Sequence, residues 1–392
     1  MRRTRVSGWA RGANNRAAST ALPEGFARDL VNLDARPDGT MALRPGQRKI
    51  YDGEAVTLAA AYGGGVVVVD GAELLRISRS GARETLGAVN PGPAAAAVHN
   101  DELFLSCGLQ ALRYDGRSLV EWGCDRPHAR VSIGAGGALV AGVYKIAVTR
   151  DDPRSGESGA EVMGVSLSGG EALAVTVTEP VYLYLTAPNG KTLYRQAQLA
   201  PGTHTITSVT DDGERLSTAH KCRPPAGHIV ASCGARLAIA EGNVLWLTEP
   251  FVPHLVDPIA GFFQYPARIT NAIPVEGGLF VTADKTYYLS ALDSEAPAQA
   301  TVANIGAIEG TGVELPDGTA AWFGEYGLTL GAPGGAISWP HRETYTSNNA
   351  VAGAAGYVDR SGVRAVVASL NRGVTHSAAG TQDYCDLEIE RL

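Results

Sequence analysis

A strand–turn–strand unit recurs along this sequence. It reads "GARLAIAEGNVLWLTEP" over Gly234–Pro250, and similar units occupy residues 64–77, 100–114 and 277–289. Each unit joins two short runs of strand-forming residues through a tight turn, such as Asp70-Gly71. Helical periodicity is nowhere sustained for three turns. The repeat therefore predicts an all-β fold, a β-propeller of about six blades, with five to seven possible.

A segment with a different strand pattern lies between the second copy of the unit (residues 100–114) and the third (residues 234–250). Residues 126–223 hold several short strands broken at Glu179-Pro180 and Pro188-Asn189-Gly190. This density of strands predicts an inserted β-sandwich, and the lack of a Cys…Trp…Cys pattern favours a fibronectin-type module over an antibody-type one. The predicted organisation is an extended N-terminal arm (1–48), a first propeller segment (49–125), the inserted sandwich (126–223) and a second propeller segment (224–392).

The charge of the chain is unevenly distributed. Residues 1–50 carry ten Arg or Lys and four acidic residues, which is a net charge of +6. The whole chain has a net charge of −7, so the remaining residues carry a net charge of −13. The net charge gives no reason to expect a general affinity for nucleic acid. A basic arm on an acidic body can dock on an acidic neighbour, and a solvated terminus is the alternative.

The sequence offers no recognisable catalytic or metal-binding motif. It contains no GxSxG, HExxH, P-loop or dinucleotide fingerprint, and the eight His are scattered. The five Cys are odd in number without C-x-x-C spacing, which favours buried free thiols in a reducing compartment. We therefore expect no enzyme activity, no metal and no cofactor.

Two loops resemble ligand-binding loops in composition, but their residues do not fit the binding patterns. "DDPRSGES" (Asp151–Ser158) has acidic residues, but Pro153 and Arg154 break the calcium-loop pattern, so we expect a solvated loop. Gly134–Gly137 lacks a strand–helix context and is expected to be a flexible connector. No apolar run follows the charged start of the chain or approaches 18 residues, so we expect neither a signal peptide nor stable membrane insertion.

The stretch Arg11–Gly46 resembles the start of a family of bacteriophage virion proteins. In these proteins a "G-x-N-N … L-P-E-G … R-D-x-V-N … G-x-L-x-x-R-P-G" arm precedes a β-propeller. Residues 142–160 and 224–250 are likewise similar to the fibronectin-type insertion of such proteins and to the propeller segment after it. The matching positions are Gly12, Asn14, Asn15, Leu22, Pro23, Glu24, Gly25, Arg28, Asp29, Val31, Asn32, Gly39, Leu43, Arg44, Pro45 and Gly46.

The resemblance implies a non-enzymatic component of a phage tail. This component would be a nozzle or hub ring, and in tail nozzles the ring is often a hexamer. The ring would extend the tail conduit below the portal and adaptor proteins. Its partners would be itself, portal, adaptor or other tail proteins, and DNA only in transit. It would be made in the host bacterial cytoplasm and located in the virion tail. The alternatives are a receptor- or carbohydrate-binding propeller on the virion surface and a glycan-active propeller enzyme.

The arm is where we expect contacts with a partner, because it carries both the basic charge and the matching motif. The candidate partner-binding residues are Arg11, Asn14, Asn15, Arg16, Pro23, Glu24, Arg28, Arg44 and Pro45.

Overall fold

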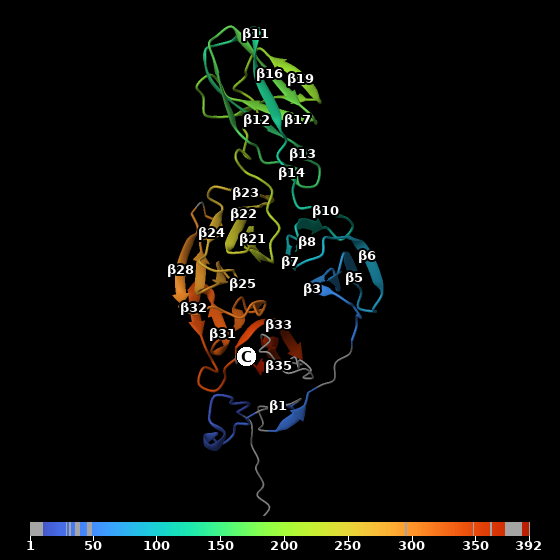
Figure 1. Cartoon of the computed structure of the whole chain (residues 1–392), viewed down its shortest axis with the longest axis vertical. Helices are drawn as coiled ribbons and strands as arrows, with labels where there is room; N and C mark the ends of the chain where they lie inside the picture. The colour runs from blue at the N-terminus through green and yellow to red at the C-terminus, as the bar shows by residue number, and fades with distance from the viewer. Residues whose placement is uncertain are drawn as a thin grey trace, which may run out of the picture. The chain divides into compact units, whose positions relative to one another are not determined.

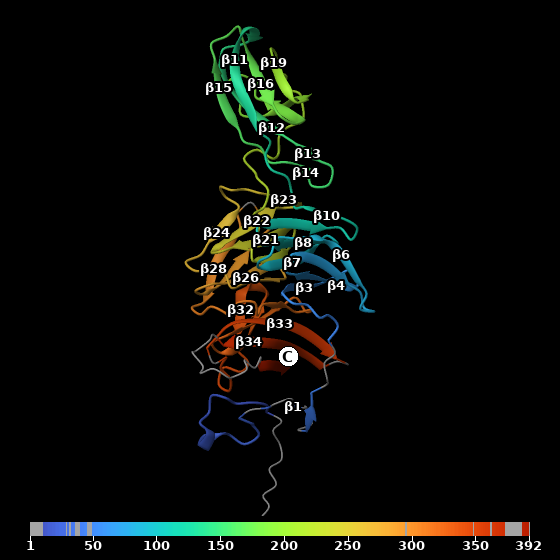
Figure 2. The ribbon, with the colours of Figure 1, turned by 45° about the vertical axis from the view of Figure 1, so that its right-hand side comes forward.

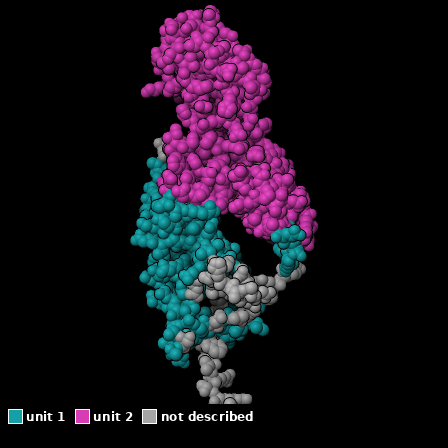
Figure 3. Space-filling view, in the orientation of Figure 1, with its two compact units in different colours: residues 1–54, 265–392 teal, residues 55–264 magenta. Residues whose placement is uncertain are grey.

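The computed structural model describes residues 11–28, 30, 33–35, 40–44, 49–294, 296–347, 349–360, 363–372 and 386–391. The regular elements of these residues are strands and two 3₁₀ turns, η1 (Ser19–Ala21) and η2 (Pro333–Gly335). The chain divides into a central unit, residues 55–264, and a terminal unit, residues 1–54 with 265–392 (Figure 3). The predicted all-β, β-propeller fold class with an inserted sandwich is confirmed.

The central unit contains three blade-type antiparallel sheets, each paired in chain order (Figure 1). The first is β3 (Val56–Tyr62), β4 (Gly65–Asp70), β5 (Glu73–Ile77) and β6 (Arg83–Ala88). The second is β7 (Ala94–His99), β8 (Glu102–Cys107), β9 (Gln110–Tyr114) and β10 (Leu119–Glu121). The third is β20 (Ile229–Cys233), β21 (Arg236–Glu241), β22 (Val244–Glu249) and β23 (Val252–Val256), with β24 (Phe262–Gln264) also on β22.

The hairpin turns and the valine run account for these sheets. Asn100 and Asp101 both have positive φ, 49° and 63°, which is the geometry of a two-residue hairpin loop whose twist matches its strands. Val67, Val68 and Val69 are all at most 3% exposed, so β4 is buried on both faces. A continuous β-branched run suits this position, because each face of an inner strand packs against a neighbouring layer.

The sandwich lies between β10 and β20 in the chain and has its own core (Figure 2). Leu173, Val175 and Val177 alternate along one strand and are at most 2% exposed, as a half-buried strand requires. One sheet is β11 (Ala129–Leu139), β16 (Glu171–Val177) and β19 (Gly202–Ile206). The other is β15 (Met163–Leu167), β12 (Gly142–Thr149), β17 (Val181–Leu185) and β18 (Tyr194–Leu199). A short hairpin, β13 (Asp151–Asp152) and β14 (Gly156–Glu157), follows β12.

The terminal unit has three further blade-type sheets, which makes six among the described residues. The first is β25 (Asn271–Val275), β26 (Gly278–Thr282), β27 (Thr286–Ser290) and β28 (Ala298–Ala303). The second is β29 (Val313–Glu314), β30 (Ala320–Gly324), β31 (Gly327–Ala332) and β32 (Ala336–Ser338). The third is β33 (Ala350–Arg360), β34 (Val363–Arg372) and β35 (Asp386–Arg391). A separate ladder joins β1 (Leu33–Ala35) to β2 (Met41–Leu43).

Candidate functional site

The beginning of the arm folds into a closed loop over residues 11–28. The Asn14 amide donates to the Ala27 carbonyl (2.8 Å), and the Ala27 amide donates to the Gly12 carbonyl (2.9 Å). The Asn14 side chain is 4% exposed, and its Oδ1 accepts the amides of Arg16 (3.1 Å) and Ala17 (2.9 Å). Asn14 therefore shapes the loop from inside, as an Asx-type turn does.

Asn15 attaches this loop to a distant segment of the terminal unit. Its Nδ2 donates to the Thr346 carbonyl (2.8 Å), while its Oδ1 accepts the Thr346 amide (2.9 Å). The Asn15 main-chain amide adds a third bond, to the Thr344 carbonyl (3.0 Å). Because an amide side chain offers a donor and an acceptor side by side, it pairs with a backbone as a strand would.

The arginines of the loop donate to main-chain oxygens of their own chain. Arg16 Nη1 bonds to the carbonyl of Arg342, and Arg28 Nη1 bonds to the carbonyl of Ala17. The Arg11 guanidinium lies 4.4 Å from the ring centroid of Phe26, which is 8% exposed. This is cation–π geometry, and it fixes the start of the loop over its one buried aromatic ring.

The remaining predicted arm residues are spread out. Pro23 and Glu24 lie at the turn that precedes Phe26, and both are exposed. Arg44 pairs with Asp34 (3.3 Å) across the β1–β2 ladder. Pro45 lies outside the described residues. The structure thus gathers the first Asn and Arg candidates at one place and leaves Arg44 elsewhere, while their role toward a partner stays a prediction.

The segment that receives the arm, residues 341–347, lies beside a cavity of about 300 Å³. Thr346 belongs to both, because its backbone pairs with Asn15 and it also lines the cavity. Among the described residues of the lining Glu325 is the single ionisable one, so they offer no carboxylate pair for acid–base chemistry. The lining residues are Gly306, Ala307, Ile308, Gly324, Glu325, Thr346, Ser347, Asn349, Ala350 and Val351.

This receiving segment carries no recognisable pattern in the sequence. "SWPHRETYTSN" has neither strand alternation nor a turn pair, and its structure depends on packing. The Arg342 guanidinium lies 4.7 Å from the ring centroid of Tyr326 and 5.9 Å from that of Trp339. The signal that could have found the segment was this mixture of aromatic and basic residues, the types most often found at contact surfaces.

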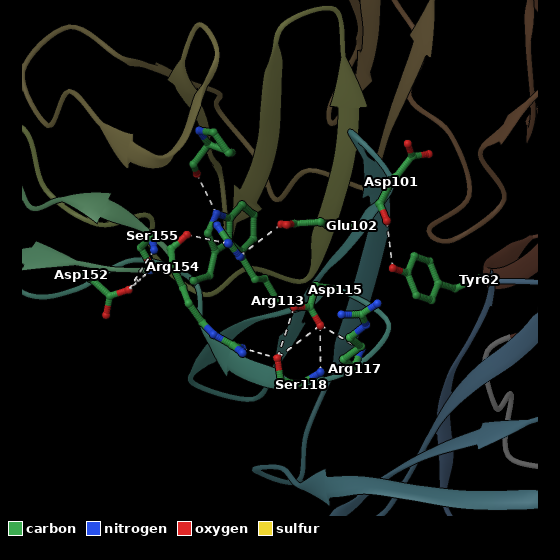
Figure 4. A network of polar contacts seen from close by, with 12 residues as sticks. Tyr62, Asp101, Glu102, Arg113, Asp115, Arg117, Ser118, Asp152, Arg154 and Ser155 are labelled. Atoms are coloured by element: carbon green, nitrogen blue, oxygen red, sulfur yellow. Dashed lines mark hydrogen bonds and ion pairs between the residues drawn. The ribbon is translucent and has the colours of Figure 1, made fainter.

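A second polar cluster lies at the base of the sandwich, where the loop Asp151–Ser158 reaches β9 and β10 (Figure 4). Arg113 Nη2 donates to the Arg154 carbonyl (2.6 Å), and Arg113 Nε pairs with Glu102 (3.1 Å). The Arg154 side chain in turn donates to Ser118 Oγ. The expectation of a solvated loop holds for Asp151, Pro153 and Arg154, which are exposed, and fails for Ser155, which is 7% exposed, and for Ser158, which is fully buried.

Glu157 is the acid at the centre of this base. Its Oε1 accepts the hydroxyls of Thr149 and Tyr184, each at 2.6 Å. Burial, and then the bond to Glu157, raises the pKa of Tyr184 well above its ordinary value. His254 Nε2 donates to the Glu157 carbonyl (3.2 Å), and burial lowers the pKa of His254. The Glu157 carboxylate therefore bonds within the sandwich, and its main-chain carbonyl contacts β23.

The described residues form no metal site, and their cysteines are free thiols. Among them, no three His, Cys, Asp or Glu side chains gather as metal ligands. Cys107, Cys124, Cys222 and Cys233 are free thiols, and burial raises the pKa of Cys107 to about 11. The prediction of free, largely buried thiols is confirmed for these four, and Cys385 lies outside the described residues. No helix in the described ranges is long and apolar enough to cross a membrane.

Comparison with known proteins gives no family. No family model matches the chain, and no curated protein matches its sequence. Among solved structures, BBS1N in complex with ARL6DN aligns over 82% of this chain and 91% of its own, at 11% identity and a TM-score of 0.31. Hsv2 of Kluyveromyces lactis aligns over 86% and 98%, at 8% identity and a TM-score of 0.31. Such values support no inference about function.

Proposed function

We propose that this protein is a structural subunit of a bacteriophage tail, a nozzle or hub ring in which each N-terminal arm ties its subunit to a neighbour. The observation that supports this proposal is the docked loop of residues 11–28. Asn14 and Asn15 belong to the motif by which the chain resembles phage virion proteins. They are also the residues that shape the loop and attach it to Thr346.

The chemistry of the docking suits exchange between copies. The loop pairs with the backbone of Thr344 and Thr346, more than 300 positions along the chain. An identical neighbour offers the same backbone groups, so the same bonds form between copies when arms are exchanged. A head-to-tail contact of this kind, repeated with the right rotation, closes a ring.

The charge distribution agrees with a conduit. The basic residues are concentrated in the first 50 positions, and the rest of the chain is acidic. An acidic lumen lets DNA pass without binding, because negative charge repels its phosphates. Portal, adaptor or other tail proteins are then the neighbours above and below, and the virion tail is the location.

The mass of the assembled protein tests the proposal. We expect native mass measurement of the full chain to give a closed oligomer, and deletion of residues 1–48 to give monomers. Arg79→Ala, an exposed arginine outside the arm, is the control and should assemble as the unchanged chain does. A chain that stays monomeric at every concentration, or a deletion that assembles normally, overturns the proposal.

A mixing experiment separates exchange from docking within one chain. Asn15→Cys and Thr346→Cys are made in two differently tagged chains and combined under mild oxidation. Exchanged arms give a disulfide between the two tags, which non-reducing electrophoresis detects. The control pairs Asn15→Cys with Leu109→Cys, an 89% exposed position outside the receiving segment, and should give none. If no disulfide joins the two tags, while a single chain made with both substitutions forms one internally, arm exchange is contradicted.

A further inference from the structure

A continuous apolar stretch of the chain forms one end of the sandwich. The stretch "IGAGGALVAGV", Ile133–Val143, has no charged side chain and none that forms hydrogen bonds. It includes the last residues of β11, the turn and the first residues of β12. Since β12 runs from this turn toward β13 and β14, the turn lies at the end of the sandwich away from them (Figure 1). We call residues 133–143 the apolar tip.

The apolar tip is exposed. Val140 is 65% exposed, Ile133 51% and Val143 44%. The alanines between them, Ala135, Ala138 and Ala141, are exposed as well. A single exposed apolar residue is ordinary, whereas a contiguous group of them marks a surface that contacts something else.

The apolar tip is also ordered, contrary to the flexible connector expected for Gly134–Gly137. Ala135 and Leu139 both register with Glu171, so residues 136–138 bulge from β11. A Cβ on Gly137 would lie 2.0 Å from the Glu171 carbonyl oxygen, and glycine is therefore required there. The glycines allow close packing of backbones at this place, and they do not mark a loose connector.

The backbone of the apolar tip is largely paired with neighbouring loops. The Gly137 amide donates to the Gly170 carbonyl (3.1 Å), and the Gly170 amide donates to the Leu139 carbonyl (2.9 Å). Val143 and Asn189 exchange two bonds, one through the Asn189 side chain (3.0 Å) and one through its amide (2.8 Å). Paired backbone groups are a precondition for entering a medium without water.

From these features we propose that the apolar tip docks reversibly into the surface of an anionic lipid bilayer. A specific protein contact relies on Trp, Tyr and Arg and on directional hydrogen bonds, and the side chains of the tip supply neither. Binding to an anionic bilayer requires an apolar surface and positive charge at the edge of that surface. Lys145 and Lys191 are exposed beside the tip. Glu171, which pairs with Ala135 and Leu139 of the tip, is an acidic residue at the same place, and its carboxylate accepts the Ser168 amide (2.6 Å).

This docking is shallow, and it differs from stable membrane insertion, for which the chain has no apolar run of sufficient length. It involves only a few small side chains, so each copy binds weakly, and several copies on one vesicle bind more strongly through avidity. The proposal does not depend on the ring, because a single chain carries a complete apolar tip.

Co-sedimentation of the full chain with vesicles tests the proposal. We expect binding to vesicles of phosphatidylcholine with phosphatidylglycerol, and weaker binding to phosphatidylcholine alone. Val140→Asp should reduce binding about tenfold, because it replaces an apolar contact with a charge that the lipid repels. Leu109→Asp changes an 89% exposed apolar residue in the β8–β9 turn of the same unit and should bind as the unchanged chain does.

Three results would overturn the proposal. The first is no binding of the unchanged chain to either vesicle, and the second is equal binding of Val140→Asp and the unchanged chain. The third is a change in oligomer mass in Val140→Asp without a change in vesicle binding, which would make the apolar tip a protein contact. Val140→Ser, a smaller change at the same exposed position, shows whether any loss reflects misfolding. A negative result in the vesicle experiment does not bear on the proposed ring, because the ring is tested by the oligomer mass of the chain without residues 1–48.

Discussion

The base of the sandwich and the docked arm both join segments that are distant in sequence, but they use different chemistry. At the base, partly buried arginines donate to main-chain carbonyls, as Arg113 does to Arg154 and Arg126 does to Lys221. At the arm, one amide side chain pairs with a backbone. A joint of buried charged groups is costly to open, because each separated group is left without its partner. A joint of half-buried, uncharged amide bonds reopens in water at smaller cost.

Other contacts at the base strengthen this contrast. Lys221 pairs with Glu249 at 2.8 Å with both side chains at most 25% exposed. Cys222 and Val256 exchange two main-chain bonds, at 3.0 and 2.8 Å. The chain enters and leaves the sandwich through this region, so the base is a permanent attachment. The arm is joined by uncharged hydrogen bonds, as the proposed exchange between copies requires.

Removal of the acid at the base should have the largest effect. Glu157→Ala leaves the buried hydroxyls of Thr149 and Tyr184 without their acceptor, and we expect a loss of about 3 kcal/mol in the free energy of unfolding. Chemical denaturation measures it. Glu161→Ala, an exposed acid nearby, is the control and should change stability by less than about 0.5 kcal/mol. Equal stabilities for the two variants would mean that the base is not held by Glu157.

The arm should respond locally. Asn15→Ala removes both side-chain bonds to Thr346 and should favour opening of residues 11–28 by about 2 kcal/mol, without a matching change in global stability. Amide hydrogen exchange of the arm measures the opening. Thr20→Ala, exposed in η1, is the control. A global loss as large as that of Glu157→Ala would contradict the contrast between the two joints.

Short-range patterns in the sequence predicted the hairpins and the sandwich. Turn pairs such as Asp70-Gly71 predicted the hairpins, and several short strands broken at Glu179-Pro180 and Pro188-Asn189-Gly190 predicted the sandwich. Contacts between residues that are distant in the chain could not be predicted from the sequence, because no residue near Asn15 indicates that Thr346 is its partner. The same limit applies to the loop Asp151–Ser158, whose polar sequence suggested solvent although Arg113, far away in the chain, fixes it.

Acid should weaken the base through His254. Burial lowers the pKa of His254, with opposing contributions from its bond to Glu157 and from Asp152, so the unfolded chain binds the proton more readily. The stability from neutral His254 is present above pH 6.5 and is lost as the pH falls toward the lowered pKa, by less than about 1.4 kcal/mol per pH unit. Asn15 does not titrate, but burial also lowers the pKa of His341 in the receiving segment, so arm opening is compared between the unchanged chain and His254→Gln, which should open alike.

Denaturation at neutral and mildly acidic pH measures the effect of His254. The comparison is with His254→Gln, whose amide can still donate to the Glu157 carbonyl but does not titrate. Burial also lowers the pKa of His99 and His341, and both variants share these contributions. The difference between the two proteins therefore isolates His254. Parallel losses in both would show that His254 contributes nothing to the acid sensitivity.

The smallest expected effect is that of Arg16→Ala. The guanidinium is exposed and donates to the carbonyl of Arg342, so water replaces the bond, and arm opening should become easier by only about 0.5 kcal/mol. Hydrogen exchange at low and high salt measures it, with Arg79→Ala as the matched exposed arginine. A loss equal to that of Asn15→Ala, and removed by salt, would mean that charge holds the arm as it holds the base. The arm would then be a second charged joint, and exchange between copies would have to overcome the same cost as opening the base.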